Sequence, residues 1–163
     1  MNITTRVARK ALFVALLMIP LATIRAQHVD EMIYLPAARL GEAVEAAAAP
    51  GGEPTKVTFL EQRDHHASIM VRRAQSGEPE LHEAFDDIYV VQSGSGVLHY
   101  GGTYEGARTV EAGELRGGTI RGGTRQPLSA GDVVVVPADV PHQVEVERGQ
   151  ALVYHVLKVR RGK

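Results

Sequence analysis

Apolar and polar residues alternate with a period close to two over most of the chain from Lys56 onward. Successive side chains of a β-strand point to opposite faces, so this period predicts strands with one buried face. The predicted strands span residues 56–60, 67–73, 88–91, 96–100, 115–120, 125–128, 132–136, 143–147 and 151–158. Short strands at regular spacing, separated by turn residues, are typical of an all-β sandwich or barrel.

A short stretch before these strands has helical spacing instead. Pro36 stands where a first helical residue is favoured, and Leu40 and Val44 lie four residues apart, on one face. The Pro-Gly-Gly sequence at residues 50–52 ends the pattern. A helix this short needs a surface to pack on, so we expect it to cover the outside of the barrel.

Residues 1–26 have the pattern of a secretory signal. Arg6, Arg9 and Lys10 give a positively charged start, residues 11–24 are apolar apart from a break at Pro20, and Ile24-Arg25-Ala26 is a passable cleavage site. The apolar run is shorter than the roughly 20 residues of a membrane span, so we expect cleavage and export to the periplasm or the medium. An uncleaved membrane anchor is the alternative.

The predicted organisation has three segments. They are a signal peptide over residues 1–26, an N-terminal extension with the short helix over residues 27–55, and the barrel domain over residues 56–163. A chain of 163 residues suits one such domain. Because the sequence contains no cysteine, any metal must be held by nitrogen and oxygen ligands.

Charge argues against a nucleic-acid partner. The whole chain has a net charge of −1, and signal cleavage would remove basic residues only, leaving an acidic domain. The Arg-Gly-Gly sequences within residues 116–124 lack interleaved aromatics, so they predict strand edges and tight turns. Two questions stay open: whether residues 101–124 form a lid, and whether Arg116, Arg121 or Arg125 meets an anionic substrate.

Polar side chains that can bind a metal lie next to two of the predicted strands. Glu80 and His82 are two residues apart and share a face, and Asp87 begins the next apolar strand. His142 lies on the apolar side of its strand together with Val144. Such a set can hold Fe, Mn, Ni or Zn. The alternative for an inward-facing histidine is a hydrogen-bonded core residue.

Other residues compete for places in this site. His66 precedes a strand and could reach the barrel mouth as a ligand or as a support for one. Asp86 replaces Asp87 if the strand register slips by one residue. His99 and His155 lie in mid-strand, where we expect structural hydrogen bonds.

The stretch from Glu80 to Gly94 resembles the first motif of the cupin superfamily. That motif runs from a pair of histidines to a glutamate and then a glycine, and His82, Asp87 and Gly94 follow its spacing. A second stretch, from Gly131 to His142, resembles the second cupin motif, and Gly131, Pro137 and His142 follow its spacing. The resemblance implies an antiparallel β-barrel of the double-stranded β-helix (jelly roll) type after a short N-terminal helix.

Four positions depart from the cupin pattern. Glu80 stands in place of the first histidine, and Asp87 in place of the glutamate. Asp139 replaces a glycine of the second motif, and Val146 replaces its asparagine. The resemblance implies a divalent transition metal held by His82, Asp87 and His142, with Glu80 as a fourth ligand.

The functional expectation is an exported metal-binding cupin that acts on a small molecule by oxygenase, isomerase or lyase chemistry. The alternative is a cupin that binds a small ligand without metal or catalysis. The resemblance also implies a homodimer, while nucleic acid, and a membrane after signal cleavage, are not expected as partners.

Overall fold

The structure is a computed structural model that describes residues 32–49, 51 and 53–162. The predicted signal peptide, residues 1–26, lies outside the described residues. Within the described part, no helix is long and apolar enough to cross a membrane. The barrel and its helix belong to one unit that begins at Leu35, and this unit is described below.

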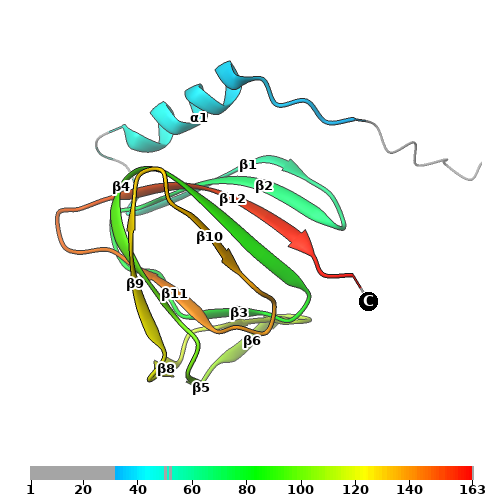
Figure 1. Cartoon of the computed structure of the whole chain (residues 1–163), viewed down its shortest axis with the longest axis vertical. Helices are drawn as coiled ribbons and strands as arrows, with labels where there is room; N and C mark the ends of the chain where they lie inside the picture. The colour runs from blue at the N-terminus through cyan, green and yellow to red at the C-terminus, as the bar shows by residue number, and fades with distance from the viewer. Residues whose placement is uncertain (1–31, 50, 52, 163) are drawn as a thin grey trace, which may run out of the picture. The chain divides into compact units, whose positions relative to one another are not determined.

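The unit consists of one helix followed by twelve strands (Figure 1). The elements are α1 (Ala37–Ala48), β1 (Thr55–Gln62), β2 (His66–Arg73), β3 (Glu80–His82), β4 (Phe85–Tyr100), β5 (Thr103–Glu105), β6 (Arg108–Glu111), β7 (Glu114–Arg116), β8 (Thr119–Arg121), β9 (Thr124–Ser129), β10 (Val133–Val136), β11 (His142–Glu145) and β12 (Leu152–Arg160). This confirms the predicted all-β architecture with a short N-terminal helix.

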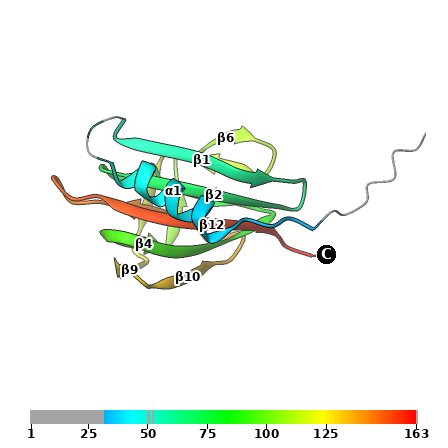
Figure 2. The ribbon, with the colours of Figure 1, turned by 90° about the horizontal axis from the view of Figure 1, so that it is seen from above.

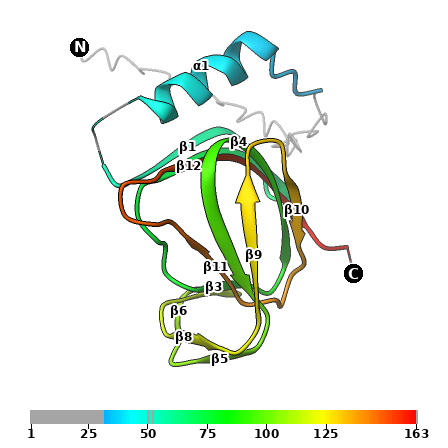
Figure 3. The same ribbon diagram turned by 60° about the vertical axis from the view of Figure 1, so that its left-hand side comes forward.

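Ten of the strands form one antiparallel sheet that curls around an interior (Figure 3). Its main path runs β1-β2-β12-β4-β11-β3-β7-β6, and β9 and β10 both pair with β4. β12, the last strand in the sequence, therefore lies between β2 and β4 (Figure 2). β1 and β6 end the path, while β5 and β8 form a small separate ribbon.

The helix covers the outer face of the sheet, as predicted. Its apolar face, with Leu40 and Val44, packs on Leu60, Met70 and Val153. It begins at Ala37 with Pro36 as its N-cap, one residue later than expected, because Pro36 has an extended backbone with a ψ of 149°.

The inner face of the sheet holds the main core. Alternate residues of β2 point inward, as predicted for Ala67, Ile69 and Val71. Leu152 of β12 is 0% exposed and Leu98 of β4 is 1% exposed. The rest of this cluster comes from β4, β9, β10, β11, β12 and the residue after β11: Tyr89, Val91, Leu128, Val136, Val144, Val146, Tyr154 and Val156.

Two predictions about strand boundaries were wrong. Residues 88–91 and 96–100 were expected to be separate strands, but they belong to the continuous β4. The glycine between them, Gly94, has a φ of +79° and lets the strand bend against Ala151 instead of ending. Conversely, residues 115–120 were expected to be one strand, but Gly117–Gly118, both at positive φ, turn the chain between β7 and β8.

Candidate metal centre

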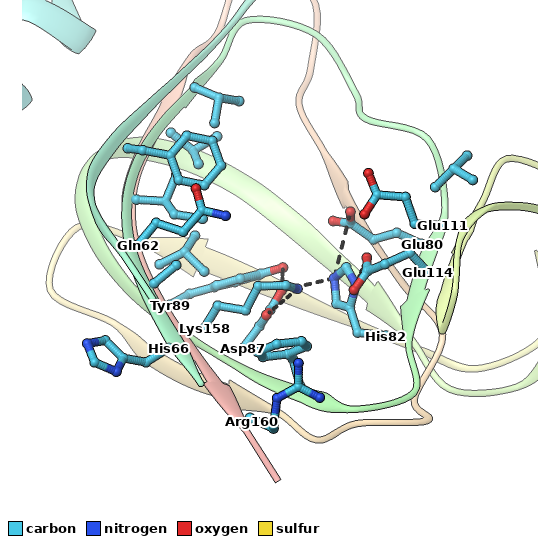
Figure 4. Close-up of a pocket in the computed structure, with 18 of the residues that line it drawn as sticks. Gln62, His66, Glu80, His82, Asp87, Tyr89, Glu111, Glu114, Lys158 and Arg160 are labelled. Atoms are coloured by element: carbon cyan, nitrogen blue, oxygen red, sulfur yellow. Dashed lines mark hydrogen bonds and ion pairs between the residues drawn. The ribbon is translucent and has the colours of Figure 1, made fainter. Parts of the chain in front are cut away.

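The structure brings all four predicted site residues together inside the barrel, and Figure 4 shows Glu80, His82 and Asp87 among them. Glu80 and His82 come from β3, Asp87 from β4, and His142 from β11. His142 lies directly across from Glu80 in the β3–β11 pair. Each of the four is at most 6% exposed, so these polar groups are almost fully removed from solvent.

The ligand atoms of Glu80, His82 and His142 lie close together, and Asp87 faces both histidines. His82 Nε2 lies 3.3 Å from Asp87 Oδ2 and 3.9 Å from Glu80 Oε2. His142 Nε2 lies 3.5 Å from Glu80 Oε1 and 3.7 Å from Asp87 Oδ2. One ligand atom each from Glu80, His82 and His142 fits within 4.8 Å of the others. Ligands at roughly 2.0–2.2 Å from a metal have separations of this order.

Hydrogen bonds turn both histidine rings toward this cluster of ligand atoms. Nδ1 of His142 lies 2.9 Å from the carbonyl oxygen of Val140, which can only accept, so Nδ1 carries the proton. Nδ1 of His82 lies 2.5 Å from Glu114 Oε2 in the same manner. The Nε2 atoms are then free to act as ligands, which is the usual arrangement of metal-binding histidines.

The His142 ring provides a direct test of fit to a cation. Its Nε2 is buried and has no hydrogen-bond partner among the described residues. In the neutral ring this atom presents a lone pair to the carboxylates of Glu80 and Asp87. A buried ring nitrogen that has no hydrogen-bond partner and faces two carboxylates is unfavourable. A metal ion removes this conflict, so the residues fit the group that the fold implies.

Asp87 is held as an anion. Burial alone would raise its pKa, but the His142 and His82 rings and the ammonium group of Lys158 outweigh burial and hold this pKa far below its usual range. Lys158 Nζ lies 3.0 Å from Asp87 Oδ1, and the Tyr89 hydroxyl donates to Oδ2 over 3.5 Å. Burial raises the pKa of Tyr89 well above its ordinary value, so this phenol remains a donor.

His82 is biased toward carrying charge in the absence of a metal. Burial lowers its pKa, but contacts with the Asp87 and Glu114 carboxylates outweigh burial, so the net pKa is raised. Two carboxylates around one ring attract positive charge, whether it comes from a proton or from a metal.

The competing residues lie elsewhere. Asp86 accepts hydrogen bonds from the backbone N–H of Ala138 and from Arg161, and so is bound outside the cluster. His66 lines the same cavity but pairs with Glu61 at 3.0 Å. His155 Nε2 lies 2.7 Å from the hydroxyl of Ser68, as expected for a structural residue.

Three residues of the site were not predicted from the sequence. Glu114 contacts His82, Arg116 pairs with Glu80, and Lys158 pairs with Asp87. Lys158 had a detectable signal, because it shares the inward face of its strand with Tyr154 and Val156. Glu114 and Arg116 lie in a glycine-rich stretch without clear alternation.

The site lines a cavity of about 650 Å³. Its wall includes inward-facing residues of β2 and β12, and it extends to the two edge strands, β1 and β6. Lys158 and Tyr89 point into it beside Asp87 (Figure 4). A cavity of this size accommodates a small organic molecule.

Glu114 tests whether the contact to His82 supports metal binding. Glu114→Gln is expected to weaken metal affinity by about 10- to 100-fold, because the amide holds the His82 tautomer less firmly than a carboxylate does. Chelator-competition titration measures this change. Glu105→Gln is the matched control, since Glu105 is exposed and pairs with Arg121. Equal affinities of the two variants would contradict a supporting role for Glu114.

Comparison with known proteins supports the fold assignment. No protein-family model and no curated protein sequence matches the chain. Among solved structures, an uncharacterized protein with a double-stranded β-helix domain from Klebsiella pneumoniae is similar, with a TM-score of 0.52 and 13% identity over 74% of this chain and 95% of that chain.

Two further solved structures are similar. TT1209 from Thermus thermophilus gives a TM-score of 0.51 and 18% identity over 72% of this chain and 94% of that chain. Pac13 from Streptomyces, a nucleoside dehydratase, gives a TM-score of 0.47 and 13% identity over 68% of this chain and 72% of that chain. The likeness to the Klebsiella pneumoniae structure agrees with the fold expected from the sequence: the chain adopts the double-stranded β-helix.

Proposed function

We propose that this protein binds one divalent transition metal and acts on a small molecule held in the cavity. His82 and His142 would hold the metal together with the carboxylates of Glu80 and Asp87. The observation that carries the proposal is the buried Nε2 of His142, which lacks a hydrogen-bond partner among the described residues and faces both carboxylates. Fe, Mn, Ni and Zn all accept this set of nitrogen and oxygen ligands.

When bound, the metal supplies a Lewis acid that polarises a substrate oxygen. The chain supplies the surrounding groups. Glu114 fixes the His82 ring, and Lys158 balances the charge of Asp87. Tyr89 keeps a phenolic proton next to that carboxylate. Such groups can orient a substrate and move protons in oxygenase, isomerase or lyase chemistry.

A second candidate function is a binding module without metal. It is favoured by two ion pairs: Arg116 pairs with Glu80, and Lys158 pairs with Asp87, so both carboxylates already have a cation. In this alternative the carboxylates would serve as hydrogen-bonding groups for a ligand. It leaves the His142 Nε2 atom unexplained, and for that reason we rank it second.

Export and dimerisation are part of the same proposal. The charge and apolar pattern of residues 1–26 supports export to the periplasm or the medium; sequencing the amino terminus of the exported chain, expected at Gln27, tests it. Val133 and Val135 of β10, at 63% and 58% exposure, support a homodimer contact. Mass in solution tests the dimer.

Metal content decides between the two functions. The chain, purified without chelator or histidine tag, is expected to contain or take up about one equivalent of a transition metal, because the cluster offers one set of ligands. Elemental analysis before and after loading with Fe, Mn, Ni or Zn measures this. Failure to take up any of these metals would support the binding module. The metal that binds also directs the substrate screen, in which the metal-free chain is the control.

A further inference from the structure

Arg73 is a cation of the cavity that has no anionic partner among the described residues. Arg73 follows Val71 by two residues, so it continues the inward-facing series of β2. It lines the same cavity as the metal centre. Its Nε donates to the hydroxyl of Tyr154 over 2.9 Å. Partly buried arginines are usually paired with an anion, so this side chain needs an explanation.

A second guanidinium group, that of Arg116 on β7, lines the same cavity as Arg73. Its nearest anion is Glu80, which our proposed function assigns to the metal. Arg116 therefore has two anionic partners, Glu80 and, at 4.0 Å, Glu114, whereas Arg73 has none among the described residues. Like charges at a partly buried site are costly unless an anion joins them.

We infer that Arg73, together with Arg116 and Tyr154, binds the carboxylate group of a monoanionic substrate. This inference rests on the proposed function and names the substrate class of the same cavity. A guanidinium fork matches the two oxygens of a carboxylate and gives strong, directional hydrogen bonds. A singly charged group fits better than a phosphate dianion because Arg116 already has anionic partners and Arg73 has none among the described residues.

Tyr154 adds a neutral donor to this subsite. Its oxygen accepts the hydrogen bond from Arg73, and its own proton has no acceptor among the described residues. Burial raises the pKa of Tyr154, so the proton stays on the phenol. The hydroxyl can therefore donate to a bound carboxylate beside the guanidinium groups.

The rest of the cavity wall indicates the body of the substrate. Val57 and Phe59 of the edge strand β1 and Val110 of the edge strand β6 all line the cavity. They are 51%, 54% and 47% exposed, which is high for side chains in such a position. An apolar body bound against them would remove this surface from water. The substrate class is therefore a small monocarboxylate with an apolar body.

The other arginines of the glycine-rich region lack these properties. Arg121 pairs with Glu105, and Arg125 pairs with Glu145. Neither lines the cavity. Of the three arginines that the sequence left open for an anionic substrate, only Arg116 therefore remains. Arg121, whose side chain is 69% exposed, provides a matched control.

The test compares phenylacetate with its neutral isostere phenylacetamide, by calorimetry on the full chain. In the native protein, phenylacetate is expected to bind at least about 10-fold tighter than the amide. The neutral amide cannot form the two charge-assisted hydrogen bonds that a carboxylate forms with a guanidinium group. Arg73→Gln should remove this preference, Arg73→Lys should retain part of it, and Arg121→Gln should leave it unchanged.

Equal affinity for the two probes, or no binding of phenylacetate by the native chain, would overturn the inference. So would an unchanged preference in folded Arg73→Gln. If that variant does not fold, the native preference and Arg73→Lys still decide the outcome. Tighter binding of phenyl phosphate than of phenylacetate would overturn the assignment to carboxylates.

Each titration is run on metal-loaded and on metal-free protein, so that the two proposals fail separately. Metal uptake without carboxylate preference overturns this inference and leaves the metal centre in place. A carboxylate preference without metal uptake supports the subsite and overturns the metal-dependent function.

Discussion

A chain in which His142 is replaced by alanine is expected to bind no transition metal at concentrations that saturate the native protein. The substitution removes the buried Nε2 atom that faces Glu80 and Asp87. One histidine and two carboxylates remain, and both carboxylates already pair with a cation, Arg116 or Lys158. We expect the affinity to fall by more than about 100-fold, which is beyond the effect of losing a supporting contact.

Elemental analysis and chelator competition measure this loss. His65→Ala is the matched control, because His65 is an exposed histidine outside the cluster, and it should retain full metal content. Circular dichroism must show that the His142→Ala chain is folded, since a buried ring is lost. A folded variant that still holds a full equivalent of metal at native affinity would contradict the proposed centre.

Replacement of Gly94 by alanine is expected to cause the largest loss of stability among the glycine positions. A Cβ atom at this position would overlap the carbonyl oxygen of Ala151, and the φ of +79° is unfavourable for any side chain. Backbone atoms of the adjacent strand cannot move away as a flexible side chain could. We expect a loss of about 4 kcal/mol or failure to fold, at the upper end of single substitutions.

Replacement of Gly101 separates the two causes of this loss, the overlap with Ala151 and the positive φ. Its φ of +75° is nearly the same, but no atom lies within 4 Å of the position that a Cβ would take. Gly101→Ala therefore carries only the conformational cost, about 1–2 kcal/mol. Urea unfolding of both variants measures the difference. If both variants lose the same stability, the close approach of β4 to Ala151 has no energetic weight.

The strand pattern and the location of the site follow from local features of the sequence. A period of two indicates which side chains face inward, and this is enough to place His142 on a buried face beside Val144. Asp87 is placed by the same argument, from the apolar strand that it begins. For Glu80 and His82 the spacing showed only a shared face, and their burial became visible in the structure.

The sequence could not show contacts that depend on strand pairing. Glu114 and Arg116 reach the cluster because β7 pairs with β3, although Glu114 lies 32 residues beyond His82 in the chain. Their own segment is rich in glycine and has no readable buried face. The expected break between two strands at Gly94 was wrong because a glycine at positive φ occurs both in turns and in bends of a continuous strand.

The place of β12 in the sheet has a consequence for synthesis. Its pairing partners β2 and β4 do not pair with each other, because residues 152–160 lie between them. A nascent chain that lacks these residues has a gap in the middle of its main sheet and an uncovered inner core. Folding must therefore wait until nearly the whole domain is present. Chains truncated before residue 152 should depend on chaperones and be degraded.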